Sequence, residues 1–206
     1  MDNMIFSIGR QFGSGGSEIG RKLSNELNIP YYDRELLAIA AQDSGLCTEV
    51  FERADERESS GLSYAFPLGF TPPGMYIHYE DILSNEKLFL LQSETIRNLA
   101  RKESCVIIGR CSDYILRDNP NCLSFFIHNT LDNRIKHIAE RENVSKARAK
   151  EMILKTDKSR AAYYNYYTNK LWGVASSYNL SIDVSILGTD GTVAFLKNLI
   201  TKKFKL

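Results

Sequence analysis

The chain has 206 residues, which is the size of one ordinary domain and too short for two enzymes. Apolar residues make up 43% of the chain and charged residues 25%, so the sequence can bury a core and is neither disordered nor fibrous. Because 26 Lys and Arg residues stand against 25 Asp and Glu residues, the net charge of +1 argues against a protein that covers a nucleic-acid backbone.

Short β-rich runs alternate with longer stretches of helical period, which is typical of βαβ units around a parallel sheet. The expected strands are Met4–Ile8, Pro30–Asp33, Cys105–Gly109, Leu123–His128 and Ser181–Leu187. The expected helices are Ser17–Leu27, Arg34–Gln42, Asn85–Arg101, Asp132–Arg141, Lys146–Lys158 and Thr192–Phe204. Two regions lack a clear period: 59–75 is predicted to be a long surface loop, and 161–178 is rich in tyrosine.

A glycine-rich turn, Gly9–Ser17, follows the first expected strand and leads into the first expected helix. Glycines let backbone N–H groups converge on an anion at the positive end of the helix dipole, so this order of elements predicts a phosphate cradle. An ordinary Gly/Ser turn is the alternative interpretation. The position after the first strand of an α/β chain favours the cradle.

The turn matches the motif G-x-x-x-x-G-K-[ST] imperfectly. Ser17 takes the hydroxyl position that would reach Mg²⁺, and Gly15 fits the second glycine. Arg10 stands where the first glycine is expected, and Gly16 replaces the lysine that bridges the β- and γ-phosphates. Arg10 is therefore the nearest candidate for the missing positive charge.

Four runs of residues add to this motif: Ile5–Gly20, Ile29–Leu36, Val106–Cys111 and Asp157–Tyr164. In this order they resemble the cytidylate-kinase-like proteins, which are relatives of cytidylate kinase among the P-loop nucleoside-monophosphate kinases. The resemblance implies an α/β, three-layer P-loop NTPase fold with a five-stranded parallel sheet. It also implies a single kinase domain over 1–206, with an inserted acceptor-side segment at about 45–85 and a helical lid at about 143–178.

The resemblance assigns roles at matching positions. It places the donor triphosphate on Gly13, Ser14, Gly15, Gly16 and Ser17, with Mg²⁺ at Ser17. Asp33 and Arg34 would face the acceptor nucleotide at the carboxyl edge of the sheet, although a helix N-cap at Asp33 beside a solvated Arg34 explains the spacing too. Arg110 would hold the acceptor phosphate bidentately, and its alternative is a surface arginine.

The lid contributes a second set of charges. Asp157 and Arg160 are spaced i, i+3 on one helix face, and the matching residues of cytidylate kinases contact ribose and phosphates. The candidate catalytic residues are thus Arg10, Arg110, Arg160 and Asp157. Arg134 is a candidate substrate contact that a solvated helix face explains equally well. We expect the tyrosines of 161–178 to be packing residues rather than residues that stack on a base.

The leading hypothesis is transfer of the γ-phosphoryl group from ATP, with Mg²⁺, to a nucleoside monophosphate or a similar small molecule. Two alternatives stay open: a nucleotide-binding sensor or assembly module with degraded kinase activity, and a kinase of a non-nucleotide metabolite. A Gly16→Lys substitution is expected to raise turnover in a degraded kinase and to leave a sensor inactive.

The remaining features predict a cytoplasmic protein that binds a small-molecule nucleotide, with neither nucleic acid nor a membrane as a partner. No apolar stretch approaches the roughly 20 residues of a membrane span, and the first residues lack a secretory pattern. The cysteines show no C-x-x-C spacing and are expected to be reduced thiols without zinc: Cys47, Cys105, Cys111 and Cys122.

Overall fold

A computed structural model describes residues 3–33 and 85–205 of the chain. The expected helix Arg34–Gln42, the loop at 59–75 and, except for Asn85, the inserted segment at about 45–85 lie outside these ranges. Among the described helices, none is both long and apolar enough to cross a bilayer.

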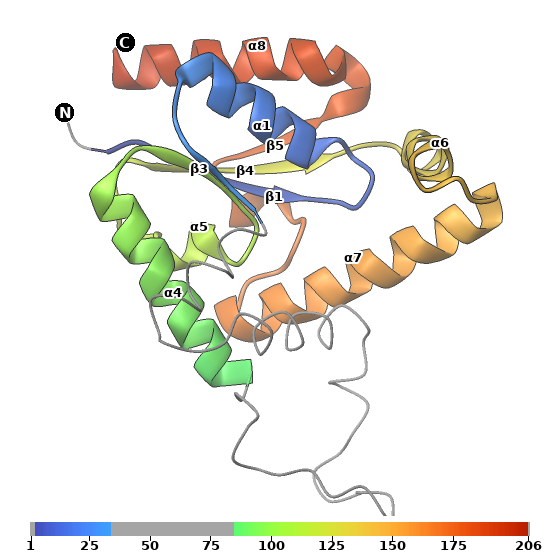
Figure 1. Ribbon diagram of the computed structural model, residues 1–206, viewed down its shortest axis with the longest axis horizontal. Helices are drawn as coiled ribbons and strands as arrows, with labels where there is room; N and C mark the ends of the chain where they lie inside the picture. Colours follow the sequence, from blue (N-terminus) through green and yellow to red (C-terminus); the bar gives the residue numbers. More distant parts are fainter. Residues whose placement is uncertain (1–2, 34–84, 206) are drawn as a thin grey trace, which may run out of the picture.

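Five strands form one parallel sheet in the order β2-β3-β1-β4-β5 (Figure 1). The strands are β1 (Ile5–Arg10), β2 (Tyr31–Tyr32), β3 (Cys105–Ile108), β4 (Cys122–His128) and β5 (Leu180–Asp183). Ile5 of β1 lies opposite Cys105 on one side and Cys122 on the other. The carboxyl ends of β1, β2 and β3 therefore meet at one edge of the sheet, where open α/β folds bind ligands.

Helices cover both faces of this sheet and form a three-layer fold (Figure 1). The helices α1 (Gly16–Leu27) and α8 (Val184–Phe204) pack on one face. The other face carries α4 (Asn85–Lys102), α5 (Ser112–Ile115) and the end of α7 (Lys146–Thr168), while α6 (Leu131–Glu142) packs against the start of α7. A short 3₁₀ turn, Ala175–Ser177, precedes β5.

The core consists of two apolar clusters, because successive side chains of a strand point to opposite faces. The cluster under α1 and α8 includes Phe6, Ile8, Ile19, Leu23, Leu196 and Ile200. The cluster under α4, α5 and α7 includes Ile5, Ile96, Leu99, Ile107, Phe126 and Tyr164. A smaller cluster of Ile138, Ala149 and Ile153 joins α6 to α7. The two larger clusters thus join the helices of both outer layers to the sheet.

Local signals define both ends of the helices α6 and α7. The Thr130 side chain accepts a hydrogen bond from the Asn133 amide, and Ser145 accepts one from the Arg148 amide, so both residues are N-caps. Each helix ends at an asparagine in the left-handed region, Asn143 with φ 52° in α6 and an equivalent residue in α7. These caps fix where the predicted lid begins.

The strand expected at Ser181–Leu187 is wrong in its second half, because α8 begins at Val184. The Asp183 carboxylate accepts a hydrogen bond of 2.9 Å from the Ser185 amide and caps this helix. The apolar composition after Asp183 suits a buried strand or a buried helix, and the cap decides for the helix.

The helix expected at Lys146–Lys158 continues to Thr168 and takes in half of the tyrosine-rich region. The Tyr167 ring stacks on Phe89 of α4 at 4.1 Å, and the Tyr163 ring lies 4.7 Å from Tyr167. The Tyr164 hydroxyl donates a hydrogen bond of 2.7 Å to Asp113. These contacts agree with the packing interpretation of the tyrosines.

Candidate active site

The glycine loop joins β1 to α1 and turns at two glycines with positive φ, Gly13 (79°) and Gly15 (86°). A Cβ atom on Gly13 would stand 2.8 Å from Cγ1 of Ile138 in α6. Glycine is required there both by the backbone conformation and by the close approach of α6.

The second half of the loop presents backbone donors at the start of α1. Gly15 is the N-cap residue of α1, and no side chain caps the helix. Within the described ranges, no backbone carbonyl accepts from the amides of Gly15, Gly16 or Ser17. These are the donors that the first turn of a helix leaves unsatisfied, and the helix dipole favours an anion beside them. The arrangement can bind a phosphate chain.

A cavity of about 510 Å³ lies over these amides. The residues lining it are Arg10, Gln11, Phe12, Gly13, Gly15, Gly16, Ser17, Glu18, Asp33, His137, Arg141, Glu142 and Arg160. The structure therefore brings most of the predicted loop residues together with Asp33, which follows β2, and with Arg160 of α7.

Arg10 occupies the space in which a lysine at position 16 would begin. A Cβ atom on Gly16 would stand 2.5 Å from the Cβ and 3.1 Å from the Cγ of Arg10. Contacts this short with the root of a side chain cannot be relieved by rotating its far end. Without a shift of the backbone, arginine at position 10 and lysine at position 16 therefore exclude each other, and this steric exchange links the two departures from the motif.

The guanidinium of Arg10 reaches along the sheet edge from β1 toward β2. One of its nitrogens lies 3.4 Å from Oδ1 of Asp33, and another lies against Gly109, where a Cβ would collide with it. Gly109 also has φ 67°, a conformation that favours glycine. The arginine thus points toward Asp33 and Gly109 rather than along α1.

Arg160 of α7 adds a second positive charge to the same cavity. Its Nη1 donates a hydrogen bond of 2.9 Å to the carbonyl oxygen of Arg10. Burial, followed by the positive charge of Arg10, lowers the pKa of Arg160. An anion bound between these arginines would relieve that unfavourable field.

Arg110 lies in a strained turn after β3. Gly109, Arg110 and Cys111 all have positive φ, with 57° at Arg110. This turn places Arg110 in a small adjoining cavity of about 60 Å³, which Arg10 and Arg160 also line. A non-glycine residue in this conformation costs about 1–2 kcal/mol, and such strain is concentrated at functional sites.

We expect Arg110→Gly to stabilise the fold by up to about 1 kcal/mol, because glycine adopts the left-handed region without steric cost. The same change should weaken binding of an anionic acceptor. Urea unfolding and acceptor titration measure the two effects. Asn28→Gly is the matched control, since Asn28 has φ 51° at the end of α1 and lines neither cavity. Loss of stability in Arg110→Gly would contradict a strained arginine.

Besides Arg110, three predicted site residues do not line the main cavity, the one of about 510 Å³ over the loop amides, although they lie around the loop. The Ser14 hydroxyl donates to the carbonyl oxygen of Gln11 at 2.9 Å, and Ser14 is 2% exposed. Asp157 and Arg134 pair with each other beside the loop, at 2.7 Å. A fourth, Arg34, lies outside the described residues.

Sequence reasoning missed the contribution of Phe12 and of His137 in α6 to this cavity. The guanidinium carbons of Arg141 and Arg160 lie 5.1 and 5.6 Å from the centre of the Phe12 ring. His137 Nδ1 lies 3.1 Å from the carbonyl oxygen of Gly13, so this nitrogen carries the proton and donates. The i, i+4 spacing of His137 and Arg141 on the helix after β4 is the signal that could have placed them at the sheet edge.

Ser17 and Asp33 are suited to hold a magnesium ion together with phosphates. The Tyr31 hydroxyl lies 3.2 Å from both the Ser17 carbonyl oxygen and Oδ2 of Asp33, which keeps the two residues close. Burial and then the charge of Asp33 raise the pKa of Tyr31 to about 12, so its hydroxyl stays a donor. In the described ranges no three His, Cys, Asp or Glu side chains could hold a metal alone. Magnesium needs no such cage, because substrate phosphates and water complete its shell.

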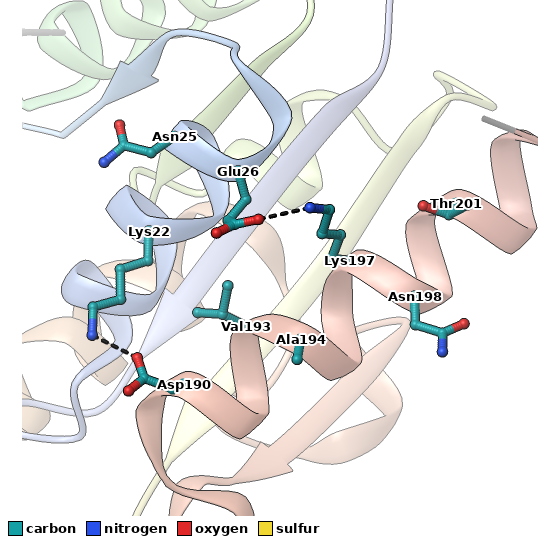
Figure 2. A pocket seen from close by; sticks show the side chains of 9 residues that line it. All are labelled: Lys22, Asn25, Glu26, Asp190, Val193, Ala194, Lys197, Asn198 and Thr201. Atoms are coloured by element: carbon teal, nitrogen blue, oxygen red, sulfur yellow. Dashed lines mark hydrogen bonds and ion pairs between the residues drawn. The ribbon is translucent and has the colours of Figure 1, made fainter.

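A larger hollow of about 810 Å³ lies between α1 and α8 (Figure 2). Two ion pairs cross it, Lys22 with Asp190 at 2.7 Å and Lys197 with Glu26 at 2.6 Å. Its acids and bases neutralise each other, and no residue of the glycine loop lines it. The larger volume of this hollow therefore does not identify it as the functional site.

The parallel sheet, the glycine loop at the start of α1 and the arginines at the carboxyl edge define a P-loop fold of the kinase type. A shikimate kinase from Bacteroides thetaiotaomicron has this fold at 13% identity and a TM-score of 0.55, with 96% of this chain and 98% of that chain covered. A gluconokinase from Sinorhizobium meliloti has it at 13% identity and a TM-score of 0.51, with 98% and 95% covered. At these identities the likeness concerns the fold alone.

The chain belongs to the cytidylate kinase-like family, whose model matches residues 5–186. It is 31% identical to an uncharacterized protein from Eubacterium ventriosum, with a TM-score of 0.71 over 96% of this chain and 98% of that chain. No curated protein sequence matches significantly. The family membership and the five-stranded parallel sheet confirm the resemblance and the fold predicted from the sequence.

Proposed function

We propose that the protein transfers the γ-phosphoryl group of ATP to a nucleoside monophosphate or a similar small anionic molecule. The single observation that carries this proposal is the set of uncapped amides at Gly15, Gly16 and Ser17, open to a cavity that also holds Arg10 and Arg160. Phosphoryl transfer requires little covalent chemistry from the protein. It requires donors and positive charge around a chain of phosphates, and this cavity supplies both.

The residues divide into a donor side and an acceptor side in this proposal. The loop amides bind the donor polyphosphate, and Ser17 with Asp33 would hold Mg²⁺, which neutralises the charge on the phosphates. Arg10 and Arg160 stabilise the charge that spreads over the transferred group. Arg110 holds the anionic group of the acceptor from the turn after β3.

The direct test is ADP release by the purified protein with Mg-ATP and a panel of nucleoside monophosphates. We expect turnover that depends on at least one acceptor and exceeds the ATPase background. If no nucleotide supports turnover while tripolyphosphate still binds, the nucleotide acceptor is wrong, and a phosphorylated metabolite panel is the next arm. If neither ATP nor tripolyphosphate binds, the kinase proposal itself is overturned.

The exchange between positions 10 and 16 changes the expected effect of restoring the lysine. Gly16→Lys alone should destabilise the fold by about 1–3 kcal/mol, because its Cβ collides with Arg10. It should not raise turnover. In the double variant Arg10→Gly with Gly16→Lys, the collision with Arg10 is absent, only the approach of 3.2 Å to the Cβ of Ile127 remains, and a lysine is expected to reach the phosphates. We expect this variant to be more stable and more active than the Gly16→Lys single variant.

A double-mutant cycle in urea unfolding and in ADP release measures this coupling. We expect a coupling free energy of about 1 kcal/mol or more in stability, as is usual for residues in direct contact. Additive effects at the two positions would contradict a steric exchange.

A further inference from the structure

Helix α7 of the predicted lid is attached to the first half of the glycine loop. Oδ1 of Asp157 accepts a hydrogen bond of 2.8 Å from the Phe12 amide. One turn further along α7, Arg160 donates to the carbonyl oxygen of Arg10 at 2.9 Å. The helix therefore holds the main chain on both sides of Gln11.

The other oxygen of Asp157 is held by Arg134 of α6. Both terminal nitrogens of Arg134 donate to Oδ2, at 2.7 and 2.8 Å, and the two side chains are 5% and 16% exposed. Burial raises the pKa of Asp157 and lowers the pKa of Arg134, in each case against the charged form. A buried pair of this kind is weak evidence for stability and is better explained by the geometry that it fixes.

These contacts hold the first half of the loop in place, and they leave the backbone amides of the second half available to a ligand. The Phe12 amide donates to Asp157, while the amides of Gly15, Gly16 and Ser17 donate to no backbone carbonyl in the described ranges. Asp157 also does not line the main cavity. Its carboxylate is consequently directed at the protein's own loop.

We infer that Asp157 is a positioning residue, which fixes the glycine loop so that its later amides face a polyphosphate, and that it does not contact the sugar of the nucleotide. The inference rests on the proposed use of this loop for a polyphosphate. It differs from the role that the family resemblance implies, in which this aspartate contacts ribose and phosphates.

Two variants test the role of Asp157. Asp157→Ala removes both contacts, and Asp157→Asn keeps an oxygen that can accept from Phe12 while it neutralises the partner of Arg134. The matched control is Glu151→Gln, because Glu151 lies on the same helix in an exposed pair with Arg148. If Asp157→Ala does not fold, the test compares Asp157→Asn with the wild-type protein and with Glu151→Gln.

The first readout is hydrogen exchange at the Phe12 amide of the protein without ligand. We expect exchange about tenfold faster or more in Asp157→Ala, an intermediate rate in Asp157→Asn, and the wild-type rate in Glu151→Gln, since about a factor of ten corresponds to one charge-assisted hydrogen bond. An unchanged rate in both Asp157 variants would overturn the inference. This readout does not depend on any ligand.

The second readout compares binding of Mg-ATP, Mg-2′-deoxy-ATP and inorganic tripolyphosphate, which has neither sugar nor base. A positioning residue predicts the same loss of affinity, about tenfold, for all three probes. A loss for Mg-ATP alone would assign Asp157 to the ribose and overturn the inference. If the wild-type protein binds none of the probes, the proposed function fails, and the exchange rate at Phe12 still decides whether Asp157 holds the loop.

Discussion

Replacing Arg10 with methionine is expected to lower the rate of phosphoryl transfer by about 10²–10³-fold, which is the usual effect of removing one donor from a charge-stabilising site. The methionine keeps the stem that packs beside Gly16, and it removes the guanidinium that lies between Asp33 and Gly109. The change should appear mainly in kcat, because the loop amides that we propose to bind the donor are unaltered. Steady-state ADP release with saturating Mg-ATP measures it.

Arg148→Met is the control for that substitution, because Arg148 lies in an exposed ion pair on α7 away from both cavities. It should retain wild-type turnover. An Arg10→Met enzyme with wild-type kcat would show that the positive charge for catalysis comes from elsewhere, and Arg160 would be the next candidate.

Replacing Arg134 with methionine is expected to destabilise the fold by about 3–5 kcal/mol, the usual result of leaving a buried charge without its partner. The Asp157 carboxylate would stay buried and would keep the hydrogen bond from the Phe12 amide. Adding Asp157→Asn should recover at least half of the loss, because the neutral side chain no longer needs a cation. Urea unfolding of the single and double variants measures both steps.

A change below about 1 kcal/mol for Arg134→Met would contradict this account, because that is the range of exposed ion pairs. Arg141→Met supplies the comparison, since Arg141 pairs with Glu142 at 2.7 Å with nearly half of its side chain exposed. Its effect on stability should stay within about 1 kcal/mol.

The glycine loop could be predicted from the sequence because its geometry is local. Gly15 and Ser17 stand between a β-rich run and an amphipathic helix, and this order alone places amides at a helix start. The parallel sheet was likewise predictable, since buried strands such as Cys105–Ile108 are continuous apolar runs. The glycine loop and each buried strand can be predicted because their signals lie in residues that are adjacent in the sequence.

The surroundings of the loop could not be predicted, because they depend on residues far apart in sequence. The Phe12 amide and Asp157 are separated by 145 positions, and His137 and Gly13 by 124. The steric exchange of Arg10 and Gly16 also requires three-dimensional distances, although both departures from the motif are visible in the sequence. Helix α7 extends through the tyrosines because they pack on α4, and the hydrophobic period of the sequence does not reveal this packing.

The dependence on contacts between distant residues also explains why the structure places Asp157 and Arg160 differently. Their i, i+3 spacing predicts one shared helix face, and both side chains do contact the loop. Spacing cannot say that one of them lines the cavity while the other turns to Phe12 and Arg134. That choice is made by α6, which supplies the buried arginine.

The most direct measurement is an amide NMR titration of the ¹⁵N-labelled protein with Mg-ATP. We predict that the amide resonances of Gly15, Gly16 and Ser17 shift most, while those beside the hollow between α1 and α8, such as that of Lys197, stay unchanged. The account would be contradicted if the resonances of these three loop amides do not shift, or if the largest shifts lie at the hollow between α1 and α8.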